Sequence, residues 1–153
     1  MNLSLIVAVD MYNAMGLRGQ LPWHIPSELR YFKELTLHNT LLVGSRTYEG
    51  LPYLPNRNII VFSKTKTYDV PTVSSLDEAL LYCQNEVFVA GGAQLYMSLL
   101  PKVSKVYRTI VQSKFEADTY FPRLAHDWKI IFQEYIKNPE EPEYCKQILI
   151  RKS

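Results

Sequence analysis

The sequence of 153 residues lacks the features that define several large classes of protein. No apolar run approaches the roughly 20 residues that are needed to span a bilayer, so no membrane association is expected. The first ten residues contain neither a basic region nor a small-residue cleavage site, and they predict a strand rather than a signal peptide. Only two cysteines are present, Cys83 and Cys145, far apart and without a metal-ligand pattern. They indicate two reduced thiols in a cytoplasmic protein.

Charge and nucleophile patterns exclude further classes. The net charge is +2, and lysine and arginine are spread along the chain, so a nucleic-acid partner is not expected. The three histidines, His24, His38 and His126, show no metal-ligand spacing, and no serine or cysteine nucleophile motif is present. We therefore expect no metal site. Neither a repeat nor a low-complexity tract is visible, and the length predicts a single domain over residues 1–153.

Apolar runs alternate with helical patterns along the chain. Strands are expected at 3–9, 40–43, 58–62, 70–73, 86–90, 105–112, 129–135 and 144–151. Helices are expected at 26–36, at 45–51 with Ser45 as N-cap, at 76–83 with Ser75 as N-cap, and at 93–100. Residues 10–20 are expected to form a loop. The pattern predicts an α/β fold: a mostly parallel central sheet of about eight strands with an antiparallel C-terminal edge strand, flanked by four helices. Ligands of such sheets bind at the carboxyl ends of the strands.

The most informative segment surrounds Glu28. Pro26 suits the first position of a helix, where its missing N–H is not needed. Phe32 at i+4 and Leu35 at i+7 lie on the same side of this helix as Glu28. A carboxylate on an apolar face is costly unless a partner pairs with it, and a ligand with two N–H donors would be such a partner. The alternative is a solvated first-turn acid that complements the helix dipole.

Three further motifs allow two interpretations each. Gly91-Gly92 follows an apolar strand and opens a helix, so its backbone can approach an anion, or it is a plain turn. It is not the G-x-G-x-x-G fingerprint of dinucleotide-binding proteins. Gly44-Ser45-Arg46-Thr47 places hydroxyls and an arginine at a helix start, where they bind phosphate or merely cap the helix. Arg57 follows a turn and offers a planar fork for a carboxylate, or it is solvated.

Taken in order, these segments resemble dihydrofolate reductases over nearly the full length of the chain. The motifs that carry the resemblance are Leu-Ile-Val-Ala at 5–8, Gly16 with Leu21-Pro22-Trp23, Pro26-x-Glu28-Leu29-x-x-Phe32, Gly44-x-x-Thr47, Leu54-Pro55-x-Arg57, Gly91-Gly92-x-x-x-Tyr96, Tyr107-x-Thr109 and Asp118-Thr-Tyr-Phe-Pro122. Each motif is weak alone, but eight motifs in the order and approximate spacing of the family are specific.

The resemblance implies reduction of 7,8-dihydrofolate to 5,6,7,8-tetrahydrofolate by NADPH, with hydride transfer to C6 and protonation at N5, for one-carbon metabolism. Glu28 would grip the 2-amino group and N3 of the pteridine, and Thr109 would hydrogen-bond Glu28. Trp23 would hold an ordered water and Leu21 would complete the catalytic set. The other implied substrate contacts are Ile6, Ala8, Leu29, Phe32, Leu51, Leu54, Ala90 and Arg57, with Arg57 on the α-carboxylate of the glutamate tail.

The resemblance also implies a set of cofactor contacts. They are Ala8, Met15, Gly16, Leu21, Gly44, Ser45, Arg46, Thr47, Ser63, Lys64, Gly91, Gly92, Ala93, Gln94, Leu95 and Tyr96. Residues 10–21 would be a mobile lid with Asp118 as its partner, and a cis peptide bond would join Gly91 to Gly92. Antifolate inhibitors would bind in place of dihydrofolate, and a monomer would suffice.

Some positions depart from the pattern of the family. Ser45 stands where an arginine or lysine usually helps to hold the 2′-phosphate of the cofactor, and Arg46 or Lys64 can substitute. Ala90 is smaller than the usual residue at the pocket edge, residues 49–54 form a shorter segment, and Ala93 replaces a third glycine found in some members.

Two rival functions are compatible with such a fold. One is an enzyme that acts on a ribityl- or ribosylamino-pyrimidine, as in riboflavin biosynthesis. Arg57 and Phe32 argue against it, because they match a benzoyl-glutamate tail. The other is a ligand-binding protein without catalysis, against which the Glu28/Thr109 pair and the lid argue.

Overall fold

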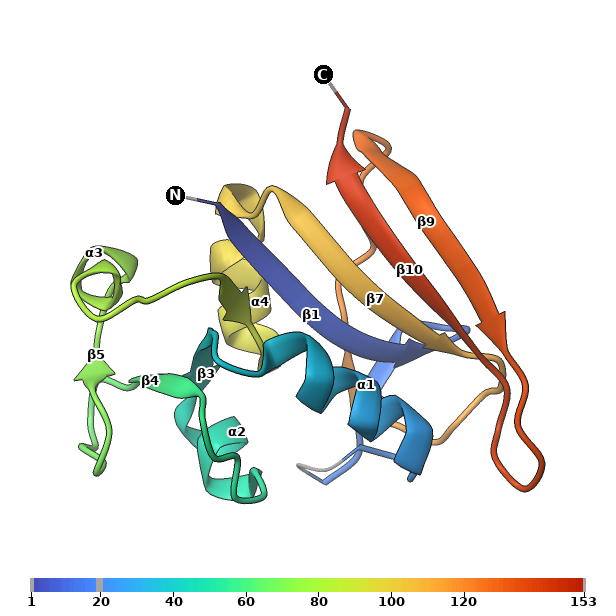
Figure 1. The fold of residues 1–153 in the computed structure, drawn as a ribbon, viewed down its shortest axis with the longest axis horizontal. Helices are drawn as coiled ribbons and strands as arrows, with labels where there is room; N and C mark the ends of the chain where they lie inside the picture. Colours follow the sequence, from blue (N-terminus) through green and yellow to red (C-terminus); the bar gives the residue numbers. More distant parts are fainter. Residues whose placement is uncertain (1, 19–20, 153) are drawn as a thin grey trace.

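An eight-stranded sheet forms the centre of the computed structural model, which describes residues 2–18 and 21–152 (Figure 1). Its strands are β1 (Leu3–Asp10), β3 (Thr40–Gly44), β4 (Asn58–Phe62), β5 (Thr72–Val73), β6 (Val87–Val89), β7 (Lys105–Val111), β9 (Trp128–Ile136) and β10 (Tyr144–Arg151). Their order in the sheet is β5-β4-β3-β6-β1-β7-β10-β9.

Most neighbouring strands of the sheet run parallel. β1 is central and pairs in parallel with β6 and β7, which suits its nearly continuous run of apolar side chains, buried on both faces. The last strand, β10, runs antiparallel to both β7 and β9. It lies one position in from the edge that β9 occupies. The predicted fold, a mostly parallel sheet with an antiparallel C-terminal strand, is confirmed.

In the part of the chain that the structure describes, four α-helices flank the sheet. They are α1 (Pro26–Thr36), α2 (Ser45–Gly50), α3 (Leu76–Leu80) and α4 (Ala93–Leu99), and a 3-10 turn η1 (Leu100–Lys102) follows α4. In Figure 1, α1 lies in front of the sheet and α4 behind it. Accordingly, Phe32 and Leu35 of α1 pack against one buried cluster, and Leu95 and Leu99 of α4 belong to another. The predicted apolar face of α1 is therefore correct.

Apart from shifts of one or two residues at the ends of other elements, as in β5, the local predictions were wrong at three places. Residues 10–20 are not all loop, because β2 (Ala14–Gly16) pairs with β8 (Thr119–Tyr120) in a second, two-stranded sheet. Ser45 is the first residue of α2 rather than its N-cap, which is Gly44 and makes no side-chain cap. α3 ends at Leu80 instead of residue 83. Its N-cap is Ser75, as predicted, whose hydroxyl oxygen accepts a hydrogen bond from the Glu78 amide at 3.2 Å.

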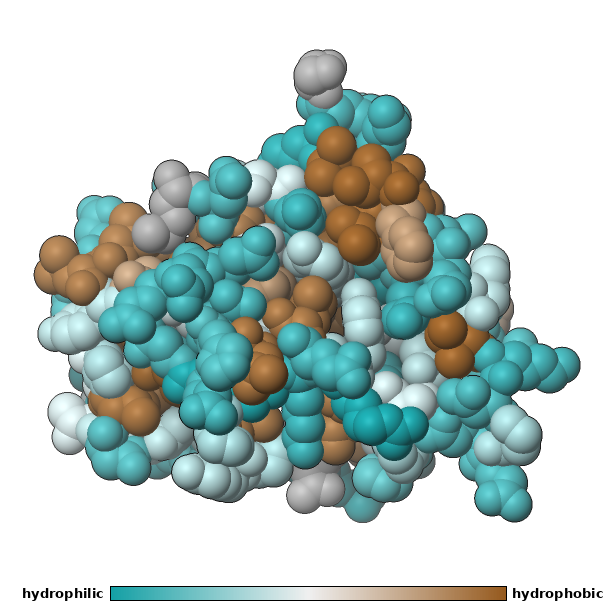
Figure 2. All heavy atoms as spheres, viewed as in Figure 1, coloured by the Kyte–Doolittle hydropathy of each residue, from teal (hydrophilic) through white to brown (hydrophobic). Residues whose placement is uncertain are grey.

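The outer strand β9 is exposed along most of its length. Figure 2 shows apolar side chains gathered over β9 and β10 at the upper right of the view. On β9, Ile130 and Phe132 are 46% and 44% exposed. This surface lies away from the carboxyl ends of β3, β4 and β6, where ligands of parallel sheets bind. Within the described residues, no helix combines the length and the apolar character that a bilayer crossing requires.

Candidate active site

Glu28 lies in the first turn of α1 and faces β7. Its carboxylate accepts a hydrogen bond from the side chain of Thr109, a residue of β7 that is only 3% exposed. Burial raises the pKa of Glu28 from its ordinary 4.5 to about 7, and the hydrogen bond acts in the opposite direction because it stabilises the charged form. Glu28 is therefore not a solvated first-turn acid. A carboxyl group with a pKa near 7 can both hold and release a proton at physiological pH.

An apolar cluster lies beside this acid. The chain brings together five of the side chains that were predicted to contact substrate, from β1, α1, the segment after α2 and the end of β6: Ile6, Phe32, Leu51, Leu54 and Ala90. Tyr107 of β7 joins the same cluster, and its ring lies 5.6 Å from that of Phe88. The sheet and α1 thus form an apolar wall next to a titratable carboxyl group, which suits a flat ligand with polar edges.

Trp23 and Ala8 belong to a neighbouring cluster with Ile25 and Val111. The indole ring of Trp23 packs against Phe115 at 5.3 Å, and its Nε1 is buried without a hydrogen-bond partner among the described residues. Buried polar groups normally have a partner. The indole N–H is therefore available to a bound water or ligand.

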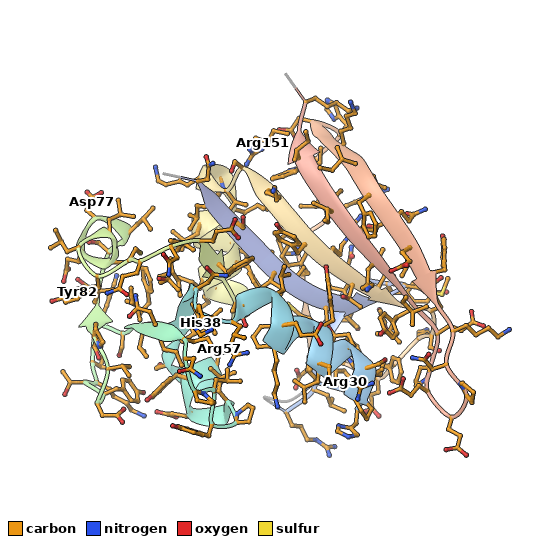
Figure 3. The ribbon with its side chains drawn as sticks, viewed as in Figure 1. Arg30, His38, Arg57, Asp77, Tyr82 and Arg151 are labelled. Carbon is orange, nitrogen blue, oxygen red and sulfur yellow. The ribbon has the colours of Figure 1, made fainter. Side chains whose placement is uncertain are left out.

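Arg57 lies at the opposite end of α1 from Glu28 (Figure 3). Its guanidinium donates to the carbonyl oxygen of Pro55 at 2.7 Å and to the carbonyl oxygen of Lys33. An open pocket of about 310 Å³ adjoins it, lined by Lys33, Glu34, Leu37, Tyr53, Leu54, Pro55 and Arg57. The two backbone acceptors orient the guanidinium, which carries five N–H donors in total, so donors remain for a carboxylate in this pocket.

Glycines meet where β3 and β6 end. The Gly44 amide donates to the carbonyl oxygen of Gly91 at 2.8 Å, and the bond between Gly91 and Gly92 is cis, as predicted. Gly91 has φ 119°, which side-chain-bearing residues rarely adopt, and a Cβ on Gly92 would lie 3.2 Å from Thr47 Oγ1. Tyr96 donates its hydroxyl proton to the carbonyl oxygen of Ile6 at 2.6 Å. The predicted contacts Gly44, Thr47, Gly91, Gly92 and Tyr96 therefore lie together.

Besides the pairing of β2 with β8, side-chain hydrogen bonds of two aspartates attach the predicted lid to the segment after β7. Asp10, 1% exposed, accepts hydrogen bonds from the amides of Tyr12 at 2.7 Å, Ala14 at 3.0 Å and Phe115 at 2.9 Å. Asp118 accepts one from the Arg18 amide at 3.0 Å, so the expected contact of Asp118 with the lid is confirmed. Residues 19 and 20 of the lid lie outside the described part of the chain. Sequence reasoning missed Asp10, for which a lone acid after an apolar strand was the available signal.

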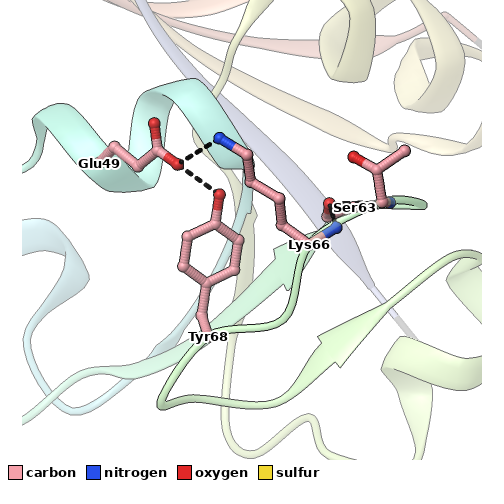
Figure 4. A network of polar contacts seen from close by, with 5 residues as sticks. Glu49, Ser63, Lys66 and Tyr68 are labelled. Atoms are coloured by element: carbon pink, nitrogen blue, oxygen red, sulfur yellow. Dashed lines mark hydrogen bonds and ion pairs between the residues drawn. The ribbon is translucent and has the colours of Figure 1, made fainter.

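Two lysines follow β4. Ser63 Oγ accepts hydrogen bonds from the amides of Thr65 and Lys66, at 3.4 Å and 3.1 Å. Figure 4 shows Lys66 Nζ and the Tyr68 hydroxyl on the same oxygen of Glu49, at 3.4 Å and 2.5 Å. Lys64 is exposed and lines, with Ser63, an open polar pocket of about 750 Å³. The charge of Lys66 is thus partly engaged by Glu49, which sequence reasoning had not anticipated.

The remaining predicted site residues differ in their solvent exposure. Leu21 is 52% exposed, and Arg46 and Gln94 are exposed. Met15 and the buried side chain of Leu95 pack into the cluster on the α4 face, so Leu95 can offer only backbone atoms to a ligand. Gly16, Leu29, Ser45 and Ala93 are partly buried.

A partly buried acid beside an apolar wall fits an α/β enzyme that binds a flat ligand. The family model described as dihydrofolate reductase matches residues 2–152. The chain is 36% identical to the dihydrofolate reductase of Haemophilus influenzae over 98% of each chain. It is 37% identical to that of Bacillus subtilis over 97% of this chain and 92% of the relative. A solved structure of the Enterococcus faecalis dihydrofolate reductase, complexed with NADP(H) and RAB-propyl, matches with a TM-score of 0.90 and 31% identity, covering 99% of this chain and 97% of the other.

The chain belongs to the dihydrofolate reductase family. It is an oxidoreductase that uses NADPH to reduce 7,8-dihydrofolate to 5,6,7,8-tetrahydrofolate.

Proposed function

We propose that Glu28 and Thr109 form the proton-handling centre of this reduction. The observation that carries the proposal is the carboxyl group of Glu28, hydrogen-bonded to Thr109 beside an apolar wall, with a pKa raised by burial to about 7. NADPH, when bound, supplies the hydride that C6 of dihydrofolate receives. Glu28 need not touch N5, because its charge and orientation favour protonation there by a water that the lid admits. Trp23, with its free indole N–H, holds that water in place.

The substrate is proposed to lie along α1, from Glu28 at the start to Arg57 near the end. The carboxylate of Glu28 would accept hydrogen bonds from the 2-amino group and N3 of the pteridine. The pteridine and benzoyl rings would contact Ile6, Ala8, Leu29, Phe32, Leu51, Leu54 and Ala90. Arg57 would take the α-carboxylate of the glutamate tail in the adjoining pocket. Antifolate inhibitors are proposed to occupy the same slot.

The cofactor is proposed to lie across the carboxyl ends of β1, β3, β4 and β6. Its nicotinamide would contact Ala8, Met15, Gly16, Leu21 and Tyr96, and its diphosphate would contact Gly44, Ser45, Arg46, Thr47 and residues 91–95. The hydrogen bond between the Gly44 amide and the Gly91 carbonyl supports this placement, because it joins the ends of β3 and β6. A Cβ on Gly92 would crowd Thr47 Oγ1 at 3.2 Å, so the backbone of Gly92 can approach a ligand more closely than that of a larger residue. Ser63 and Lys64 would take the 2′-phosphate.

One assay separates the proposed reaction from its rivals. Loss of NADPH absorbance is expected only when dihydrofolate is present. A ribosylamino-pyrimidine that drives NADPH oxidation in place of dihydrofolate would indicate the riboflavin-type enzyme. Binding of dihydrofolate without any oxidation of NADPH would indicate a non-catalytic binding protein.

Arg57→Leu is expected to weaken dihydrofolate binding tenfold or more. A charge-assisted bidentate pair is typically worth about 1.5–3 kcal/mol, which is the contribution lost with the guanidinium. The KM for dihydrofolate and the Kd of a pteridine without the glutamate tail measure this effect, and the truncated pteridine should bind both proteins equally. Arg57→Lys is the matched control, because it keeps the positive charge but loses the planar guanidinium. Its affinity for dihydrofolate should lie between that of the parent and that of Arg57→Leu. Equal loss for both ligands would make Arg57 structural, through its bonds to Lys33 and Pro55.

Lys64→Ala is expected to lower the affinity for NADPH and to leave that for NADH nearly unchanged. The 2′-phosphate is the only group that distinguishes the two cofactors. Lys64 and Lys66 both line the polar pocket after β4, but Lys66 also pairs with Glu49. Fluorescence titration at two salt concentrations checks this, and the preference should shrink with added salt. Arg46→Ala is the comparison. If it removes the preference and Lys64→Ala does not, the assignment of the cation is wrong.

The active unit is proposed to be a monomer of one domain, residues 1–153, in the cytoplasm. All the segments assigned to substrate and cofactor come from one chain, and strands from both ends of that chain share one sheet. Cys83 and Cys145 are both free thiols, which suits a reducing compartment.

A further inference from the structure

Helix α1, which carries Glu28, has no cap of its own. Its N-cap residue, Ile25, offers no side-chain hydrogen bond, and Pro26 has no N–H. The amide of Ser27 is therefore the first free donor of the helix. It donates to Glu141 Oε2 at 3.1 Å, and the Ser27 hydroxyl donates to Glu141 Oε1 at 2.8 Å. A carboxylate from the loop between β9 and β10 thus caps the helix from 114 residues away in sequence.

Two further side chains complete this arrangement. Asn138 Nδ2 donates to Glu141 Oε1 at 2.9 Å and to Ser27 Oγ at 3.2 Å, and the hydroxyls of Tyr144 and Ser27 are 2.8 Å apart. We call Ser27, Asn138, Glu141 and Tyr144 the α1 clasp. The Ser27 hydrogen bonds, the contact with Asn138 and the nearby Arg30 hold the pKa of Glu141 below its ordinary value. Arg30 projects from the same end of α1 (Figure 3).

The clasp is connected to both partners of the acid centre. Ser27 directly precedes Glu28 on α1. Tyr144, 3% exposed, is paired with Val111 of β7, two residues beyond Thr109. Two positions further along the same strands, Lys146 is paired with Thr109. The clasp therefore ties the beginning of α1 to the pair of strands that holds the hydrogen-bond partner of Glu28.

We infer that Glu141 is a positioning residue that, through Ser27, holds Glu28 against Thr109 and so sets the affinity for dihydrofolate. The inference rests on the role proposed for Glu28. An ionised carboxylate also complements the positive end of the α1 dipole. A helix start without this cap can move away from β7, and small displacements of a group that orients substrate are costly in turnover.

Glu141→Ala is expected to raise the KM for dihydrofolate about tenfold and to lower kcat, with the KM for NADPH unchanged. Glu141→Gln should stay within about twofold of the parent, because its amide oxygen can still accept the Ser27 N–H. Glu143→Gln is a control from the same loop, since the carboxylate of Glu143 pairs with the exposed Lys137 at 3.3 Å and not with Ser27. Ser75→Ala is the control for stability: it removes the cap of α3, lowers Tm, and should leave both KM values unchanged.

Amide hydrogen exchange tests, independently of turnover, whether Glu141 stabilises the first turn of α1. The Leu29 amide bonds to the carbonyl oxygen of Ile25 at 3.1 Å in the first turn of α1. Glu141→Ala should speed its exchange, and Ser75→Ala should not. Unchanged exchange at Leu29 would overturn the inference even if the parent enzyme were inactive with dihydrofolate. Faster exchange with an unchanged KM, as for a merely stabilising contact, would overturn it as well. Failure of the parent enzyme to oxidise NADPH with dihydrofolate would instead contradict the proposed function.

Discussion

Glu28→Gln is expected to lower the rate of dihydrofolate reduction by about 10²–10⁴-fold at neutral pH, the usual contribution of a positioned acid or base. The amide keeps the shape of the side chain and can still accept the hydrogen bond from Thr109, but it cannot carry charge or exchange a proton. At low pH the substrate is protonated before it binds, so the variant should recover much of the rate. Single-turnover rates measured on both sides of the Glu28 pKa of about 7 check this.

Two controls accompany this variant. Glu28→Asp keeps a carboxylate on a shorter side chain and should retain far more activity at neutral pH than Glu28→Gln. The affinity for NADPH should be the same in all three proteins, because none of the cofactor contacts changes. A loss of rate that is equal at every pH would contradict the proposed role, and so would unimpaired turnover.

Glu28→Gln is also expected to stabilise the ligand-free protein. Burial raises the pKa of Glu28 from 4.5 to about 7, so the folded state binds a proton more tightly than the unfolded state does. The protein loses stability as the pH rises from 4.5 through about 7, because the buried carboxyl group must then ionise. Each pKa unit corresponds to 1.36 kcal/mol, so Glu28→Gln should be more stable than its parent by up to about 3 kcal/mol above pH 7.

Urea unfolding of parent and variant at several pH values measures this difference. The contributions of all other titratable groups are shared by the two proteins and cancel. The gain in the free energy of unfolding should be small below pH 4.5 and should grow until about pH 7. A gain in the free energy of unfolding that does not depend on pH would show that burial does not raise the pKa of Glu28. The substitution would then act through packing alone.

Sequence patterns predicted α1 and its apolar face correctly because both depend on local spacing. Pro26 sets the start of the helix, and Glu28, Phe32 and Leu35 repeat with its period, so no distant residue is needed to place them on one side. The strands follow from apolar runs in the same way. The prediction that Ser45 is the N-cap of α2 was wrong by one residue, because Gly44, the last residue of β3, takes that position. The exact cap residue depends on local backbone angles, which sequence patterns do not give.

Contacts between distant segments were not predictable in this way. β2 and β8 are two or three residues long and pair across about a hundred positions, so neither has a periodic pattern. The same holds for Asp10 with Phe115 and for Glu141 with Ser27, in which a carboxylate meets a backbone amide. An acid in a loop looks solvated in sequence, and only the folded chain brings the amide to it.

The sequence by itself determined the class of fold, the apolar face beside Glu28 and the glycines at the ends of β3 and β6, because periodicity and backbone freedom are properties of neighbouring residues. The raised pKa of Glu28 was decided by the tertiary structure alone. The burial that raises the pKa of Glu28 comes from strands and helices far along the chain, and Thr109 lies 81 positions away on β7. Free energies of desolvation and hydrogen bonding depend on what surrounds a group in space, and sequence spacing does not contain that information.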